Sequence, residues 1–163
     1  MQLTTTVGGQ IVKKFIIRGL ASFFGLGYLP AAPGTWGSIG AFFIWLFFLR
    51  ALDTRAYLIT LILFVFFAVH ISNLANKKYY KKQDSPHIVI DEVAGYLVSM
   101  MYVSSGIYWG IAGLILFRVF DILKPYPVNM AERLPGGIGV VADDVAAGLY
   151  VAMILNATAY FLL

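Results

Sequence analysis

Five apolar runs follow one another along this chain, and each is close to the length that a helix needs to cross a lipid bilayer. Crossing the hydrocarbon takes about 20 mostly apolar residues. Backbone groups in lipid must find partners within their own segment, which favours helices over open sheets. The first and third runs are short, so each is either a full span or partly interfacial or re-entrant. We expect an all-α, polytopic membrane helical bundle with about four to five spans, formed by Trp36–Leu52, Tyr57–Ala75, Ile88–Val103, Gly106–Leu123 and Val145–Leu163.

The composition supports a membrane protein and removes several other classes. Of 163 residues, 60% are hydrophobic and 12% are charged, whereas soluble domains average roughly 45–50% apolar and about 25% charged. The chain has no cysteine, which excludes disulfides, thiolate metal sites and cysteine nucleophiles. Its net charge of +4 fits attraction to anionic lipid. Because the basic residues flank apolar runs rather than forming one patch, we expect no nucleic-acid partner; protein partners are unknown.

Residues 10–24 have a different pattern from the five runs. Apolar residues recur at helical spacing along one side, and the basic residues Lys13, Lys14 and Arg18 lie opposite. This pattern is typical of an amphipathic helix that lies in the membrane interface. A signal peptide is the alternative, but Arg18 interrupts the apolar run. We therefore divide the chain into an N-terminal interfacial segment, residues 1–24, and a membrane-embedded domain, residues 25–163.

Positive charge predicts the orientation of the bundle. Basic residues precede the first run and follow the second and fourth, whereas the turn near 104–106 and the C-terminal end carry none. Cytoplasmic loops are enriched in Lys and Arg, so five spans with a cytoplasmic N-terminus satisfy the pattern. The same topology gathers seven of the eight acidic residues on the cytoplasmic side. They are Asp84, Asp91, Glu92, Asp121, Glu132, Asp143 and Asp144.

These acids indicate a metal site. Carboxylates near hydrocarbon are unfavourable unless they are paired or bind a cation, and Mg²⁺ is the natural ion for an all-carboxylate site acting on phosphate. Asp91 and Gly95 share a helix face, and Asp144 and Gly148 repeat that spacing. Two such helices could pack closely and present their carboxylates to one cation. Adjacent Asp91 and Glu92 at a helix start could instead complement the helix dipole, whereas capping alone explains the Asp143–Asp144 cluster poorly.

Two further clusters could bind phosphate. The Gly/Pro-rich loop from Gly25 to Ser38 enters the first run, where Thr35 or Ser38 can cap a helix whose N-terminus suits phosphate. A plain loop with a capped helix is the alternative. Arg118, Asp121 and Lys124 fall three residues apart and so share one helix face. Arg118 and Lys124 would bind phosphate oxygens while Asp121 orients one of them or binds a metal; basic side chains paired with one acid at the membrane edge would show the same spacing.

Together these clusters resemble the phosphatidylglycerophosphatase A family, from about Gly25 to Gly148. The chain reads AAPGTWGS, IVIDEVAG, FRVFDILKPYP and GGIGVVADDVAAG in that order, with no departure at the acidic positions. The resemblance implies a Mg²⁺-dependent lipid phosphatase of the bacterial inner membrane, multi-pass, with its active site on the cytoplasmic face. Its substrate would be the membrane lipid phosphatidylglycerophosphate, and its product phosphatidylglycerol.

Roles for the residues follow from the clusters and the resemblance together. We expect Asp91, Asp121, Lys124 and Asp143 to be catalytic, and Thr35, Ser38, Arg118 and Lys124 to bind substrate. The expected metal ligands are Asp84, Asp91, Glu92, Asp143 and Asp144. Glu132 lies outside the matched acidic positions and is expected to be dispensable. Attack by metal-activated water is favoured, with an aspartyl-phosphate intermediate left open.

Two other functions fit part of the pattern. A small membrane transporter can also hold intramembrane acids, but acids at a single interface make a poor transmembrane path. A CDP-alcohol phosphotransferase would use interfacial acids with Mg²⁺, yet the chain has no DG-x₂-AR motif followed by spaced Asp residues.

Overall fold

The structure is a computed structural model that describes residues 2–80, 85–103 and 106–162. Within these residues the chain is helical, without a β-strand. A 3₁₀ turn, Leu26–Tyr28, precedes α2, and π-helical turns at Trp45–Leu49 and Asn76–Tyr80 extend α2 and α3. The α-helices are α1 Gln2–Ala21, α2 Pro33–Ile44, α3 Thr54–Ala75, α4 Ile90–Ser99, α5 Ile107–Leu123, α6 Val128–Ala131 and α7 Gly137–Leu162.

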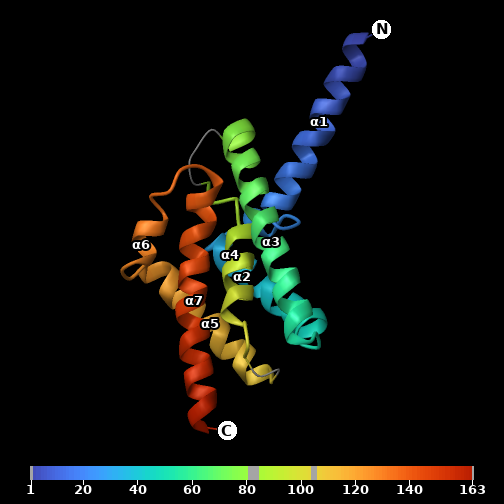
Figure 1. The fold of residues 1–163 in the computed structure, drawn as a ribbon. Coiled ribbons are helices and arrows are strands. Elements are labelled where there is room, and N and C mark those ends of the chain that lie inside the picture. The colour runs from blue at the N-terminus through green and yellow to red at the C-terminus, as the bar shows by residue number, and fades with distance from the viewer. Residues whose placement is uncertain (1, 81–84, 104–105, 163) are drawn as a thin grey trace.

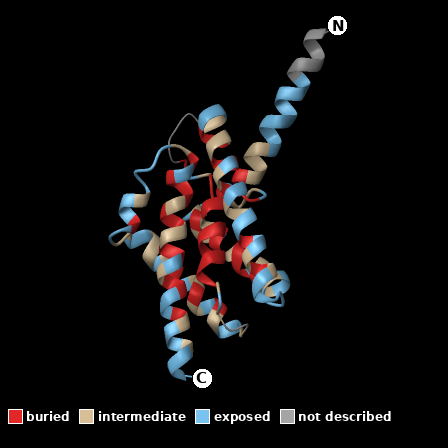
Figure 2. Ribbon diagram, viewed as in Figure 1, coloured by how far each residue is buried: buried red, intermediate tan, exposed pale blue. Residues whose placement is uncertain are grey.

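Helix α4 is the centre of the bundle. It packs against α2, α3, α5 and α7, and it lies in the middle of the ribbon in Figure 1. Glu92 is its one residue that is not fully buried, and Figure 2 shows the buried colour concentrated there. A helix that is apolar or small on every side must be covered on every side. The other helices therefore form a shell around α4.

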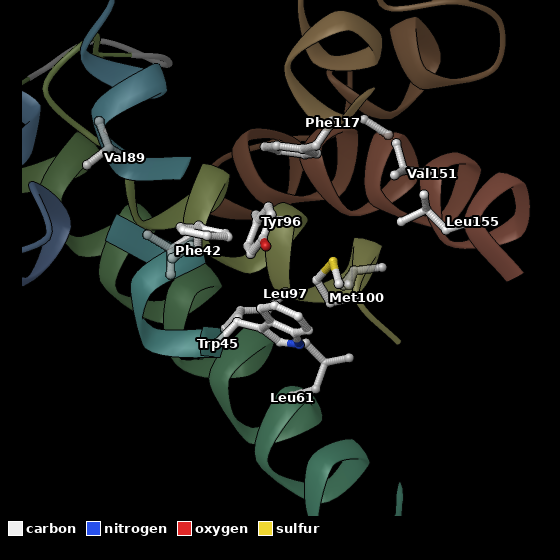
Figure 3. Close-up of a cluster of buried hydrophobic side chains, with 14 of the residues drawn as sticks. Phe42, Trp45, Leu61, Val89, Tyr96, Leu97, Met100, Phe117, Val151 and Leu155 are labelled. Carbon is white, nitrogen blue, oxygen red and sulfur yellow. The ribbon is translucent and has the colours of Figure 1, made fainter. Parts of the chain in front are cut away.

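Large side chains of α4 and of the helices around it pack together in the core. Trp45, Tyr96 and Phe117 are among the largest fully buried side chains, and Figure 3 shows them with residues of α3 and α7. The hydroxyl of Tyr96 donates to the Gly110 carbonyl at 3.1 Å, and that of Tyr57 donates to the Leu97 carbonyl at 2.7 Å. Because buried polar groups are costly without partners, these bonds let two tyrosines sit inside an apolar core.

Two helices are long and apolar enough to cross a membrane, judged over the described residues: Thr54–Tyr80 and Gly137–Leu162. Pro33–Leu49 is apolar but shorter. The third predicted run, Ile88–Val103, forms a helix only over its ten central residues. At 1.5 Å per residue, that helix is about 15 Å long, roughly half of the hydrocarbon thickness. Sequence length alone overstated this helix because residues outside Ile90–Ser99 are apolar without being helical.

Helix α1 covers most of the stretch 10–24 that was predicted to be helical, but it ends at Ala21, three residues before the end of that stretch. Its N-terminal part projects away from the bundle (Figure 1). Residues 8–16 are exposed on the apolar and basic sides alike, whereas Ile17 and Leu20 pack against the core near α3. The end of α1 is joined to the entrance of α4, because the Val89 amide donates to the Ala21 carbonyl at 2.9 Å.

Candidate active site

A cavity of about 490 Å³ opens where the N-terminal ends of α2, α4 and α7 meet the C-terminal end of α5. Its lining brings together residues from all four sequence clusters. The charged residues of the lining are Asp91, Glu92, Arg118, Asp121, Lys124, Glu132, Asp143 and Asp144. Segments up to 112 residues apart in sequence, from Ala32 to Asp144, therefore share one pocket.

Close packing of α4 on α7 sets the position of the acidic pairs. A Cβ on Gly95 would lie 2.7 Å from the Asp144 carbonyl oxygen, and a Cβ on Gly148 would collide with the Gly95 carbonyl. Glycine at both positions lets the two backbones touch. The predicted packing of two helices with acid-plus-glycine spacing is thereby confirmed, and it brings Asp91 and Asp144 to the same cavity.

Arg118 on α5 is held by two carboxylates. Its Nη1 atom lies 2.7 Å from Asp121 Oδ2 and 4.0 Å from Glu92 Oε1. The Asp121 contact is the i,i+3 pair that the sequence spacing predicted. Because Arg118 and Glu92 are about 15% exposed, this group is shielded from much of the solvent and holds the guanidinium in one place.

Lys124 crosses from the end of α5 to the start of α7. Its Nζ donates to Asp143 Oδ2 at 2.7 Å and lies 3.1 Å from Glu132 Oε2. Burial by itself would lower the pKa of the ammonium, but the Asp143 hydrogen bond and the charges of Asp143 and Glu132 raise the pKa of Lys124 above its ordinary value. Lys124 has φ 42° and ψ 58°, a left-handed conformation that usually favours glycine. The ammonium is therefore fixed, charged and carried on an unfavourable backbone conformation.

The acids of α4 and α7 have unused hydrogen-bonding capacity. Glu92 Oε2, Asp143 Oδ1 and Asp144 Oδ1 are buried and make no hydrogen bond. Oxygen atoms of this type are the ligands that Mg²⁺ prefers, so the chemistry of the donors fits a magnesium ion. Within the described part of the chain, however, no three His, Cys, Asp or Glu side chains are arranged as a ready-made metal group.

The start of α2 forms another wall of the cavity. Ala32, Pro33 and Gly34 line it, and a Cβ on Gly34 would collide with Glu92 and lie 3.0 Å from Arg118 Nη1. Thr35 and Ser38, the predicted substrate-binding residues of this loop, do not line the cavity. The Ser38 hydroxyl is buried and donates to the Gly34 carbonyl at 2.9 Å.

Two acidic residues remain, of which one lies outside the described residues and the other lines the cavity. Asp84, a predicted metal ligand, lies outside the described residues. Glu132, expected to be dispensable, lines the cavity beside Lys124. Its position follows from α6, which returns the chain from Pro125 toward α7. The sequence spacing of Lys124 and Glu132 does not predict this contact, because a turn rather than a shared helix face brings the two side chains together.

Known proteins similar to this chain are lipid phosphatases by name. Residues 19–159 match the family described as Phosphatidylglycerophosphatase A. Proteins named Phosphatidylglycerophosphatase A from Haemophilus influenzae and Escherichia coli are each 33% identical, over 90% and 83% of this chain and 91% and 79% of their own length. A Bacteroides thetaiotaomicron protein provisionally named a phosphatidylinositol-3-phosphatase is 37% identical over 78% of this chain and 83% of its own. No solved structure matches.

Proposed function

Because the chain belongs to the phosphatidylglycerophosphatase A family, we propose that the cavity is the active site in which it hydrolyses phosphatidylglycerophosphate. The products are phosphatidylglycerol and inorganic phosphate. The observation that carries this proposal is the meeting of two fixed cations and five buried or half-buried carboxylates of the matched motifs in one pocket. A phosphate monoester needs this combination of charge neutralisation and positioning.

Arg118, Lys124 and the start of α2 bind the phosphate group. Asp121 and Asp143 hold the two cations by their 2.7 Å contacts, so each cation is oriented before substrate arrives. The absence of a side chain at Gly34 lets Glu92 and Arg118 approach the N-terminus of α2 closely. Positive charge aimed at the phosphate oxygens stabilises the charge that develops as the phosphorus–oxygen bond breaks.

Asp91, Glu92, Asp143 and Asp144 would hold Mg²⁺, supported by the three unpartnered carboxylate oxygens among them. Bound there, the ion would polarise the phosphate and lower the pKa of a coordinated water. We assign the nucleophile to water, with Asp91, which lines the cavity at the start of α4, accepting its proton. Attack at phosphorus breaks the ester bond, and the departing glycerol oxygen takes up a proton.

The chain would carry out this reaction at the cytoplasmic face of the bacterial inner membrane, as a multi-pass protein with α1 at the interface. This location is supported by the two helices long enough to cross a membrane and by the distribution of basic residues.

Because the chain contains no cysteine, single introduced cysteines can report the topology by chemical labelling. A cysteine in place of Tyr108, which is 84% exposed, should react with an impermeant maleimide outside intact cells. One in place of Lys78 should react only after lysis, and the reverse pattern would contradict this topology.

Hydrolysis by the purified chain tests the activity and the metal together. Phosphate release from phosphatidylglycerophosphate should disappear in a chelator and return with Mg²⁺, because clustered carboxylates would otherwise repel the substrate phosphate. Full activity in chelator would disprove the metal role while leaving the phosphatase activity intact. No release under either condition would disprove the activity.

Phosphatidylinositol 3-phosphate is a second candidate substrate, favoured by the name of the Bacteroides thetaiotaomicron relative. Both lipids present a phosphate monoester at the membrane surface, so the same cations and carboxylates would act on either. Comparing kcat/KM for the two lipids in the same vesicles separates them.

A further inference from the structure

A second hollow, of about 630 Å³, lies between α1 and the turn that follows it, and none of its lining is shared with the active-site cavity. We call it the α1 groove. Ile11, Phe15 and Phe24 give it an apolar floor, and Lys14 and Arg18 give it a cationic edge. Helix α1 carries no acidic residue. The groove therefore offers apolar surface and positive charge side by side.

The three apolar side chains of the floor are exposed. Ile11 is 63% exposed, Phe15 79% and Phe24 81%. Single exposed apolar side chains are ordinary, but a contiguous group beside cations marks a binding surface. An occupant with an apolar part would remove this surface from water.

The backbone after α1 is strained in a way that builds the groove. Phe23 and Phe24 have φ values of 47° and 58°, and Gly25 follows with 98°. Bulky residues rarely adopt this left-handed region. The two rings stay in edge contact, with centroids 5.5 Å apart, but Phe23 is 8% exposed in the core whereas Phe24 is exposed. Phe24 is thereby left at the surface, where its ring lines the groove.

The cationic edge is fixed at one end. Arg18 Nε donates to the Tyr28 hydroxyl at 2.9 Å, and the guanidinium lies over the rings of Tyr28 and Tyr80 at 5.5 and 5.6 Å. The Tyr28 and Tyr80 hydroxyls are themselves 2.7 Å apart. Lys14 lies one helical turn before Arg18 on the same face of α1. Two cations one turn apart can share one anionic headgroup.

We propose that the α1 groove binds one anionic phospholipid of the bilayer, with an acyl chain on the apolar floor and the headgroup phosphate between Lys14 and Arg18. The complementarity of charge favours an anionic lipid over a neutral one. The proposal rests on the membrane location proposed above, and it replaces general adsorption of α1 by a defined lipid site.

This site would adjoin the active-site cavity through one wall. The His87 ring packs against Tyr28 with centroids 4.8 Å apart, and its Nδ1 lies 3.0 Å from the Gly27 carbonyl oxygen. Pro86 and Ile88, on either side of His87, line the cavity. A lipid in the α1 groove therefore lies behind the segment that leads into α4.

Photo-crosslinking of the full chain in neutral detergent tests the site without any turnover. The probes are phosphatidylglycerol and phosphatidylcholine with the same diazirine-bearing acyl chain, neither of which has a phosphate monoester. Phosphatidylglycerol should label the peptides that contain Phe15 and Phe24, and phosphatidylcholine should label them much less. Phe15→Ser and Phe24→Ser should lower the labelling, and both side chains are exposed enough for the fold to tolerate serine.

Lys13 provides the matched control for Lys14. The two neighbours have the same charge on the same helix, but only Lys14 lines the groove. Lys14→Gln should weaken phosphatidylglycerol labelling by about fivefold, the effect of one cation near an anionic lipid, whereas Lys13→Gln should change it little. Equal loss in both variants would overturn the site in favour of diffuse attraction. If these variants changed the oligomeric mass of the protein and left the labelling unchanged, a second copy of the chain would be the occupant of the groove. Because the probes are not hydrolysed, loss of phosphatase activity would not produce either result.

Discussion

Replacing Asp91 or Asp144 by asparagine should lower kcat/KM for phosphatidylglycerophosphate by about 10² to 10³-fold each, the range seen when one transition-state contact is removed. Both side chains are about 5% exposed and line the cavity. Asparagine preserves nearly the whole volume but removes the charge that would hold a cation. Steady-state hydrolysis over a series of Mg²⁺ concentrations measures the effect.

The fold should survive these two changes. Asp144 faces the negative charges of Asp121, Glu92 and Asp143, so removing its charge relieves repulsion in the absence of metal. The unfolding midpoint should therefore stay the same or rise. Asp53→Asn is a suitable control because Asp53 caps α3 by accepting from the Arg55 and Ala56 amides, and asparagine caps helices equally well. Wild-type activity in Asp91→Asn and Asp144→Asn would show that these carboxylates only shape the helix ends.

The extent to which the fold was predictable depends on the element. The lengths of the apolar runs located α3, α5 and α7, although α7 begins at Gly137 rather than at Val145. They overstated α4, whose ten residues are buried by neighbours that no local pattern reveals. The left-handed residues Phe23, Phe24 and Lys124 were also not predictable, since nothing in their residue types favours that conformation.

The candidate site was predictable where helical spacing determines it. The Arg118–Asp121 pair and the Gly95–Gly148 approach follow from residues three or four apart on helices. Roles in the loop before α2 were harder, because capping and ligand binding use the same residue types; there Gly34, rather than Thr35 or Ser38, reaches the cavity. The contact of Glu132 with Lys124 could not be predicted from the sequence, because it depends on tertiary structure.

Lys124→Gln should lower kcat/KM by about 10² to 10³-fold, and additional Mg²⁺ should not restore it. Lys124 is the cation that joins α5 to α7 through its 2.7 Å bond to Asp143. Glutamine can still donate a hydrogen bond, but it supplies no charge to the phosphate. It also leaves the Asp143 carboxylate buried without its counter-ion, which costs about 3–5 kcal/mol for a fully buried pair. The Lys124 side chain is only half-buried, and its second partner, Glu132, is exposed. The loss of stability should therefore be smaller than that.

A double variant separates the two roles of Lys124. Adding Asp143→Asn to Lys124→Gln removes the stranded charge, so the unfolding midpoint should recover toward that of the wild type. Activity should stay low, because no ammonium faces the phosphate. Glu132→Gln, which removes only the weaker and more exposed partner at 3.1 Å, should reduce kcat/KM by less than tenfold. If the double variant regained activity together with stability, Lys124 would be a structural counter-ion of Asp143 and not a phosphate-binding residue. A Glu132→Gln effect as large as that of Lys124→Gln would instead place Glu132 among the groups that fix the ammonium for catalysis.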